Sequence, residues 1–126
     1  MIEGDSFHRF DRAEMRARLN AADGPPISHF GPEANLLADL AATFARYGET
    51  GAGRVRRYIH DAAEAEKLGG QPGTFTDWQP MEPDTDLLFY EGLHGAVKTP
   101  EVDVARYPDL LIGVVPVINL EWIQKL

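Results

Sequence analysis

In the ten residues DLLFYEGLHG, numbers 86–95, four consecutive apolar residues are followed by an acid, two glycines and a histidine. A short apolar run bounded by turn-forming residues is typical of a central strand in a parallel sheet. In open α/β sheets the ligand binds beyond the carboxyl ends of the strands, and Glu91 stands at such an end. A carboxylate there suits a nucleotide-bound Mg²⁺, whereas a solvated acid before a tight glycine turn explains the same residues equally well.

A second apolar run, LLIGVVPVI at residues 110–118, predicts another central strand with a bend at its proline. A short helix is expected at 101–107, and a strand–helix–strand unit of this kind makes the right-handed crossover of a parallel sheet. The strongest helix is predicted after Pro32, because apolar residues recur there at helical spacing, and it is expected to end at Gly48. Its core-facing side chains are Leu36, Leu37, Leu40, Ala41 and Phe44.

Residues 54–60 alternate in a way that predicts a strand, with 74–78 as its antiparallel return strand and a short helix between them at 61–67. One face of residues 54–60 carries Arg54, Arg56, Tyr58 and His60, which suits a polar ligand, although an edge strand displaying charge is the commoner use. The sequence therefore predicts one α/β domain over residues 1–126. It consists of a partial parallel sheet with flanking helices and an antiparallel appendage at about 54–78.

Composition excludes several classes of function. The net charge of −8 argues against a nucleic-acid binder, because no basic surplus exists to displace counterions from phosphates. The absence of cysteine excludes disulfides, thiolate metal sites and a cysteine nucleophile. No apolar run approaches the ~20 residues of a membrane span and no signal peptide is recognisable, so a cytoplasmic protein is expected.

The chain begins with IEGD, which is typical of the end of a strand, and closes with LEWIQKL, which is typical of the start of a helix. These ends favour a piece of a larger fold over a small complete domain with frayed termini.

A group of basic residues follows Asp5 and His8 near the start of the chain. Asp11 and Glu14 have the spacing of a capping box, which predicts a short helix at 13–19. Arg12 and Arg16 are four residues apart and share a face of that helix. With Asp5 and His8 just before it, this face is suited to an anionic group such as a phosphate.

This carboxylate–histidine–arginine set fits kinase chemistry, in which Asp5 accepts the proton of a substrate hydroxyl. His8 and Arg12 then hold an anionic substrate, and Glu91 lies near the metal of the nucleotide. The set lacks a phosphate-binding loop, because no GxxxxGK[ST] segment occurs in the 126 residues. A metal-dependent hydrolase that uses Asp5, His8 and Glu91 remains an alternative.

Five segments closely resemble bacterial phosphoribulokinases, which belong to the phosphoribulokinase/uridine kinase family. They are IEGDSFHRFDR at 2–12, YGETGAGRVRRYIHD at 47–61, PGTFTDW at 72–78, LLFYEGLHGAV at 87–97 and LLIGVVPVINLEWIQK at 110–125. The resemblance covers nearly the whole chain, and the words FHRF, YIHD and INLEWIQK distinguish it from uridine and pantothenate kinases. It implies a P-loop kinase-like α/β fold and transfer of the γ-phosphoryl group of ATP to ribulose 5-phosphate, giving the bisphosphate of the Calvin cycle.

The resemblance also implies roles for individual residues. Asp5 and Lys125 match catalytic positions, and Asp5 and Glu91 match the positions that serve Mg²⁺ and the ATP-bound metal. Substrate-side positions are matched by His8, Arg12, Arg16, Tyr58 and His60, with an arginine at 16 where the family often has a lysine.

The resemblance makes the missing loop informative. The family's phosphate-binding loop precedes the strand that ends at Asp5, so we expect an internal fragment that is inactive alone. A non-catalytic module that binds a sugar phosphate is the other alternative. The full-length relatives are homo-oligomers, which is the expectation for a full-length version of this protein.

Overall fold

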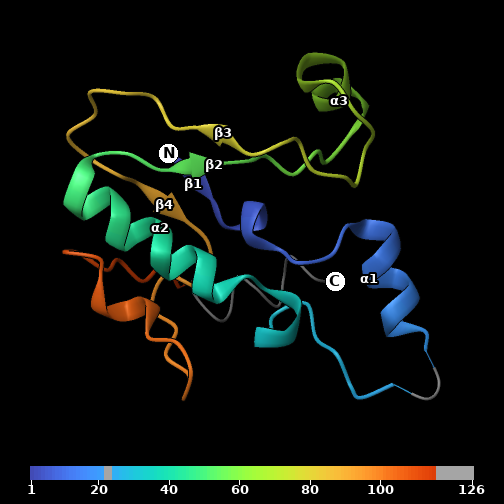
Figure 1. Cartoon of the computed structure of the whole chain (residues 1–126). Helices are drawn as coiled ribbons and strands as arrows, with labels where there is room; N and C mark the ends of the chain where they lie inside the picture. The colour runs from blue at the N-terminus through green and yellow to red at the C-terminus, as the bar shows by residue number, and fades with distance from the viewer. Residues whose placement is uncertain (22–23, 116–126) are drawn as a thin grey trace.

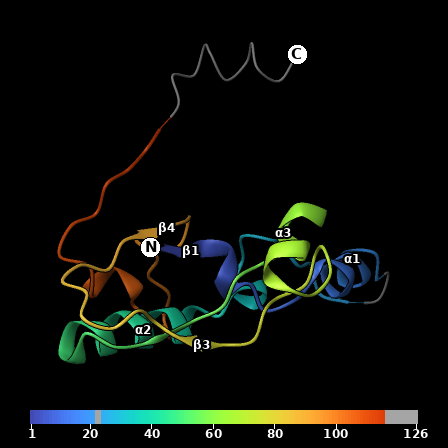
Figure 2. The same ribbon diagram turned by 90° about the horizontal axis from the view of Figure 1, so that it is seen from above.

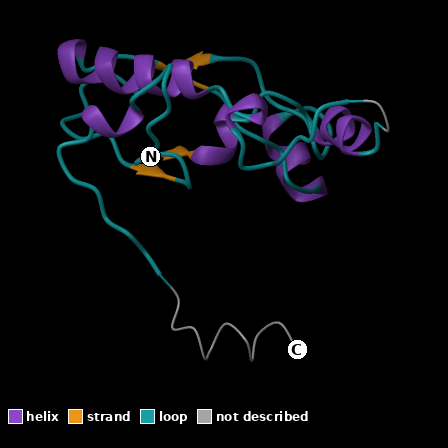
Figure 3. Ribbon diagram, turned by 90° about the horizontal axis from the view of Figure 1, so that it is seen from below, coloured by secondary structure: helices purple, strands orange, loops and turns teal. Residues whose placement is uncertain are grey.

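The computed structural model describes residues 1–21 and 24–115 (Figure 1). In chain order its helices are α1 (Arg12–Leu19), α2 (Leu37–Thr50) and α3 (Ala62–Leu68), with 3₁₀ turns at Gly4–Phe7, Pro32–Ala34 and Val104–Arg106. Its strands are β1 (Ile2–Glu3), β2 (Arg54–Val55), β3 (Gln79–Pro80) and β4 (Tyr90–Glu91). The four strands form two short sheets, and α2 packs beside them (Figure 3).

β1 and β4 pair in parallel, with Ile2 opposite Tyr90 and Glu3 opposite Glu91. The start of the chain and the segment around Tyr90 therefore lie side by side, as a parallel α/β arrangement requires. The strands approach closely at their ends, because a Cβ on Gly4 would lie only 2.9 Å from the Cα of Gly92. Glycine is needed at both positions for this approach, and the approach brings the end of β4 beside the turn that begins at Gly4.

β2 and β3 pair antiparallel, with Arg54 opposite Pro80 and Val55 opposite Gln79. A bridge between Tyr58 and Phe75 continues this pairing toward α3. An antiparallel appendage is therefore confirmed, but the predicted strands at 54–60 and 74–78 are wrong in extent: only Arg54–Val55 and Gln79–Pro80 form strands, and the second lies just beyond the predicted return strand. In Figure 1 the two paired segments run together from β2 and β3 to α3. They bring the Tyr58 end of the appendage toward α1.

The core lies along one face of α2. Leu37, Leu40, Ala41 and Phe44 are buried there against Ile2, Phe7 and Val104, and Leu36 packs beside them, as its spacing predicts. The Phe44 ring also meets the Tyr90 ring edge to face at 5.3 Å. Helix α2 thus supports β1, β4 and the turn between β1 and α1.

The predicted bounds of α2 were wrong at both ends. The proline turn at Pro32–Ala34 is a separate 3₁₀ turn, and α2 begins at Leu37. At the other end Gly48 stays within the helix, and Gly51 takes the left-handed conformation that ends it, with φ of 67°. Gly48 and Gly51 are both residues that can end a helix. The helix ends at Gly51, where the chain turns toward β2.

The buried strand predicted from the opening stretch is also corrected. Only Tyr90–Glu91 form β4, and Leu87 and Phe89 are 77% and 52% exposed, while Leu88 packs against the core. Successive strand residues point to opposite faces, and no part of the described chain covers the second face.

The second predicted strand is not formed either. Residues 110–115 run away from the body without strand pairing and are exposed (Figure 2). Residues 116–118 of that run lie outside the described residues. An apolar run becomes a strand only where a neighbour accepts its backbone hydrogen bonds, and none does so in the described part. The helix expected at 101–107 is reduced to the 3₁₀ turn Val104–Arg106.

The capping signal at the start of α1 is confirmed in detail. The Asp11 side chain accepts from the Glu14 amide at 2.8 Å, and the Glu14 carboxylate accepts from the Asp11 amide at 3.0 Å. This reciprocal pair fixes where α1 starts, and so places Arg12 in its first turn. Among the described residues, no helix is long and apolar enough to cross a membrane.

Candidate functional site

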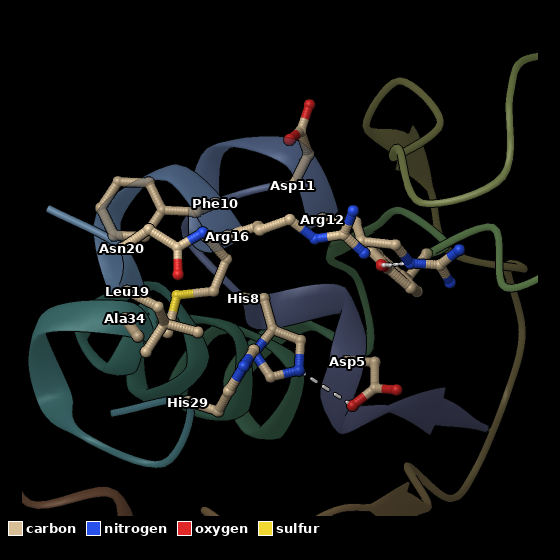
Figure 4. Close-up of a pocket in the computed structure, with 12 residues that line it drawn as sticks. Asp5, His8, Phe10, Asp11, Arg12, Arg16, Leu19, Asn20, His29 and Ala34 are labelled. Atoms are coloured by element: carbon tan, nitrogen blue, oxygen red, sulfur yellow. Dashed lines mark hydrogen bonds and ion pairs between the residues drawn. The ribbon is translucent and has the colours of Figure 1, made fainter. Parts of the chain in front are cut away.

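A cavity of about 320 Å³ lies between the 3₁₀ turn Gly4–Phe7, α1 and the appendage. Its lining includes five residues that the sequence predicts for the site, namely Asp5, His8, Arg12, Arg16 and Tyr58. Figure 4 shows Asp5 and His8 on the segment that follows β1, facing the Arg12 and Arg16 side chains of α1. With Asp11 and His29, which also line it, the cavity combines two carboxylates, two imidazoles and two guanidinium groups.

The carboxylate of Asp5 lies between two histidine rings. Its Oδ1 is 3.0 Å from His8 Nε2, and its Oδ2 is 3.1 Å from His60 Nε2. Partial burial raises the pKa of Asp5, but the hydrogen bonds and charges of His60 and His8 outweigh this and hold it below the usual value. Asp5 is therefore ionised at neutral pH and keeps lone pairs free for a further partner.

His60 in turn lies between two carboxylates. Its Nδ1 is 3.0 Å from Glu64 Oε2, and the same oxygen accepts from the His60 amide at 2.7 Å. Because both ring nitrogens face an acceptor, both contacts are satisfied only when the ring carries both protons. The hydrogen bond to Asp5 raises the pKa of His60, burial lowers it, and Glu64 raises it further, so that the net shift is upward.

Glu64 is a site residue that the sequence reasoning missed. Its amide donates to the Asp61 side chain at 2.9 Å, which is the N-cap contact of α3. The spacing of Asp61 and Glu64 was a detectable helix-start signal. What the spacing did not indicate is that Glu64 reaches back to His60 and fixes the orientation of its ring.

Arg12 connects α1 to the appendage. Its Nε donates to the Tyr58 hydroxyl at 3.2 Å, and its Nη2 donates to the His60 carbonyl at 2.9 Å. Its backbone amide donates to the Gly73 carbonyl at 2.9 Å. Gly73 has φ of 89°, and a Cβ there would come 2.8 Å from the Arg12 Cβ, so only glycine fits this contact.

Two predicted site residues lie elsewhere. Glu91 is exposed at the end of β4, outside the cavity lining, and its strand pairs with the strand that leads directly to Asp5. Lys125 lies outside the described residues. Across residues 1–21 and 24–115 no three His, Asp or Glu side chains form a cluster that could hold a metal ion.

Replacing Glu64 by Gln is expected to lower the pKa of His60 toward its usual value, because a neutral amide no longer favours the charged ring. The pH titration of the His60 ring, followed by NMR, measures this, and Glu66→Gln on the exposed side of the same helix is the control. An unchanged His60 titration in Glu64→Gln would contradict the assignment of Glu64 as its partner.

The same shift has a consequence for stability. Folding raises the pKa of His60, so the folded state holds the proton more tightly than the unfolded chain. The stabilising contribution of the charged ring is therefore complete below about pH 6.5, the usual histidine value, and is lost as the pH rises through the raised pKa. In Glu64→Gln this pH-dependent part of the unfolding free energy is expected to become smaller.

Comparison with known proteins gives one consistent result. The sequence model of the phosphoribulokinase/uridine kinase family matches residues 1–126. The chain is 62% identical to a plasmid-encoded phosphoribulokinase of Cupriavidus necator, and the match covers 100% of this chain and 44% of the relative. It is also 62% identical to the phosphoribulokinase of Nitrobacter vulgaris, over 99% of this chain and 44% of that protein.

The solved structures give a matching fold. The solved structure of phosphoribulokinase from Rhodobacter spheroides matches 98% of this chain and 43% of its own length, with a TM-score of 0.82 and 56% sequence identity. The chain thus spans less than half the length of the relatives it matches, and over that span it has their P-loop kinase-like fold. From the family match over every residue and the high identity of these relatives, it follows that the chain belongs to the phosphoribulokinase/uridine kinase family.

Proposed function

We propose that this protein takes part in the phosphorylation of ribulose 5-phosphate by ATP, and that the described residues supply the sugar-phosphate side of the site. The observation that carries the proposal is the gathering of Asp5, His8, Arg12, Arg16 and Tyr58 around one cavity. A volume of about 320 Å³ is adequate for a small polar metabolite. The names of the relatives support ribulose 5-phosphate as that metabolite.

In this proposal Arg12 and Arg16 of α1 bind the phosphate group of the sugar. Guanidinium groups make paired, charge-assisted hydrogen bonds to phosphate oxygens, and Arg12 is already held in place by Tyr58 and the His60 carbonyl. The charged His60 ring adds a positive group beside the same arginine. His8 lines the same cavity and orients the sugar toward Asp5.

Asp5 takes the proton of the hydroxyl that is phosphorylated, on one of its carboxylate oxygens. Its lowered pKa keeps it ionised and ready to accept, though it makes a weak base. A weak base suffices, because phosphoryl transfer passes through a loose transition state and depends mainly on positioning and charge stabilisation. Lys125 is proposed as a further catalytic residue on the strength of the family resemblance alone.

The carboxylates of Asp5 and Glu91 are suited to Mg²⁺, which prefers oxygen ligands and is bound by one or two carboxylates together with substrate phosphates. Both acids are exposed, and the oxygens of Asp5 have lone pairs beyond those used by the two histidines. Bound there with ATP, Mg²⁺ would neutralise charge on the transferred phosphoryl group. The hydrolase alternative uses Asp5, His8 and Glu91. These three residues form no three-ligand cluster in the described part of the chain, so the hydrolase hypothesis gains no support.

Calorimetric titration of the chain with ribulose 5-phosphate tests the binding half of the proposal. We expect saturable binding that ribulose without the phosphate does not reproduce, because the arginines recognise the phosphate. Equal affinity for ribulose and ribulose 5-phosphate, or no binding of either, would contradict the proposal.

An ADP-release assay with ATP, Mg²⁺ and ribulose 5-phosphate addresses the catalytic half. We expect no turnover by the 126-residue chain, because it has no GxxxxGK[ST] loop to hold the triphosphate. Robust turnover would show that this expectation is wrong. Binding without turnover is also the behaviour of a non-catalytic sugar-phosphate module. A homo-oligomeric state and a cytoplasmic location stay predictions.

A further inference from the structure

Arg56 is a half-buried arginine that none of the roles above uses. Its guanidinium lies 3.7 Å from the centre of the Phe75 ring and 4.9 Å from that of Trp78. Burial lowers the pKa of Arg56, and the charge of Asp39 offsets this only in part. Among the described residues, no carboxylate lies within ion-pair distance of it. A charge kept under these conditions needs a reason other than an ion pair.

The guanidinium donates instead to two backbone carbonyls. Arg56 Nε lies 2.9 Å from the Ser6 carbonyl oxygen, and Nη2 lies 2.5 Å from that of His8. The two carbonyls flank Phe7, whose own carbonyl accepts from the Leu36 amide at 2.7 Å. Three successive carbonyls of the segment that carries Asp5 and His8 are therefore held by groups distant in sequence.

The rings around Arg56 complete this arrangement. Trp78 meets the buried Phe7 ring edge to face at 5.7 Å, so the appendage and the 5–8 segment share an aromatic contact as well. Arg56 itself lies outside the cavity lining, behind the backbone from which Asp5 and His8 extend into the cavity. Its side chain contacts the site through that backbone and through Phe75, whose ring centre lies 5.2 Å from that of Tyr58.

We propose that Arg56 is a positioning residue: by holding the Ser6 and His8 carbonyls, it fixes the backbone that aims Asp5 and His8 into the cavity. This couples the appendage, which carries Tyr58 and His60, to the segment that carries the proposed base. The expected effect of Arg56 on substrate binding rests on the proposed function. Its effect on the geometry of the site rests only on the contacts of Arg56.

Arginine is suited to this task in a way that lysine is not. Its planar fork donates along two directions at once, and its flat face stacks on aromatic rings. The ammonium of lysine is a single point charge on a flexible stem, so it cannot hold both carbonyls in the same orientation while stacking between Phe75 and Trp78. Arg56→Lys therefore keeps the charge and removes the two-point hold.

The test compares Arg56→Lys with Arg57→Lys in the full chain. Arg57 is the next residue, is exposed, and has only a 3.9 Å contact with Glu3, so it is a matched control. Three quantities are measured: the calorimetric Kd for ribulose 5-phosphate, the ¹⁵N signals of the His8 ring at one neutral pH, and the midpoint of thermal unfolding. In Arg56→Lys we expect the Kd to rise at least about tenfold, because small misplacements of positioned groups have large effects. We also expect displaced His8 signals and a midpoint shift under about 4 °C.

Each other outcome decides the matter. Unchanged Kd and His8 signals in Arg56→Lys overturn the inference, and so does loss of the folded state, which would make Arg56 purely structural. If the unsubstituted chain does not bind ribulose 5-phosphate, the proposed function fails. In that case the role of Arg56 is judged from the His8 signals alone. A change in these signals in Arg56→Lys but not in Arg57→Lys supports the inference. Unchanged signals in both variants overturn it.

Discussion

Arg12→Met is expected to weaken binding of ribulose 5-phosphate by at least about 100-fold. Hydrogen bonds to a charged group contribute about 1.5–3 kcal/mol each, and every 1.4 kcal/mol corresponds to a factor of ten in affinity. The substitution removes the donors aimed at the phosphate and also the tether from α1 to the Tyr58 hydroxyl and the His60 carbonyl. Calorimetric titration measures the change.

Arg18→Met is the matched control for this substitution. Arg18 lies on the same helix, stacks on the Phe10 ring at 3.9 Å, and is outside the cavity lining. Arg18→Met removes the same charge from α1 as Arg12→Met does, so a general electrostatic effect would weaken binding equally in both variants. Equal losses, or unchanged affinity in Arg12→Met, would contradict the assignment of the phosphate to Arg12.

Leu40→Ala is expected to lower the free energy of unfolding by about 2–5 kcal/mol, the usual range for a buried leucine. Leu40 lies on α2 and is fully buried in the core that also contains Ile2 and Val104. Domains of this size have a total stability of about 5–15 kcal/mol, so the substitution removes a large fraction of it. Urea denaturation followed by circular dichroism measures the change.

Leu87→Ala is the control, because the same side chain is deleted where it is 77% exposed. Exposed substitutions usually change stability by less than about 0.5 kcal/mol. Similar losses in the two variants would mean that α2 does not organise the core. Loss of ribulose 5-phosphate binding in folded Leu40→Ala is also expected, because α2 begins one residue after Leu36, whose amide holds the Phe7 carbonyl.

Local signals predicted much of this molecule. The capping box of Asp11 and Glu14 specified α1 and hence the shared face of Arg12 and Arg16, because capping is a contact within four residues. The periodicity of Leu37, Leu40 and Phe44 identified the buried face of α2 in the same way. The residue pattern singled out Asp5, His8, Arg12 and Arg16, the family resemblance added a role for Tyr58, and the structure brings all five to one cavity.

Other features followed from no local pattern. Gly48 and Gly51 are equally good helix stops by sequence, and only the path of the chain toward β2 selects Gly51. The apolar runs at 87–90 and 110–115 have the composition of buried strands, but burial needs a second surface to pack against. In the described chain only one face of the first run is covered. Neither run pairs with a neighbouring strand along its full length.

The sequence by itself determined the start of α1, the buried face of α2 and the set of residues with the chemistry for a sugar phosphate. Only the tertiary structure decided how these residues act on one another: His60 between Asp5 and Glu64, Gly73 against Arg12, and Arg56 on the Ser6 and His8 carbonyls. Contacts within a helical turn depend on spacing along the chain. Contacts such as that of Arg56 join residues about 50 positions apart, and their geometry exists only after the core has packed the two segments together.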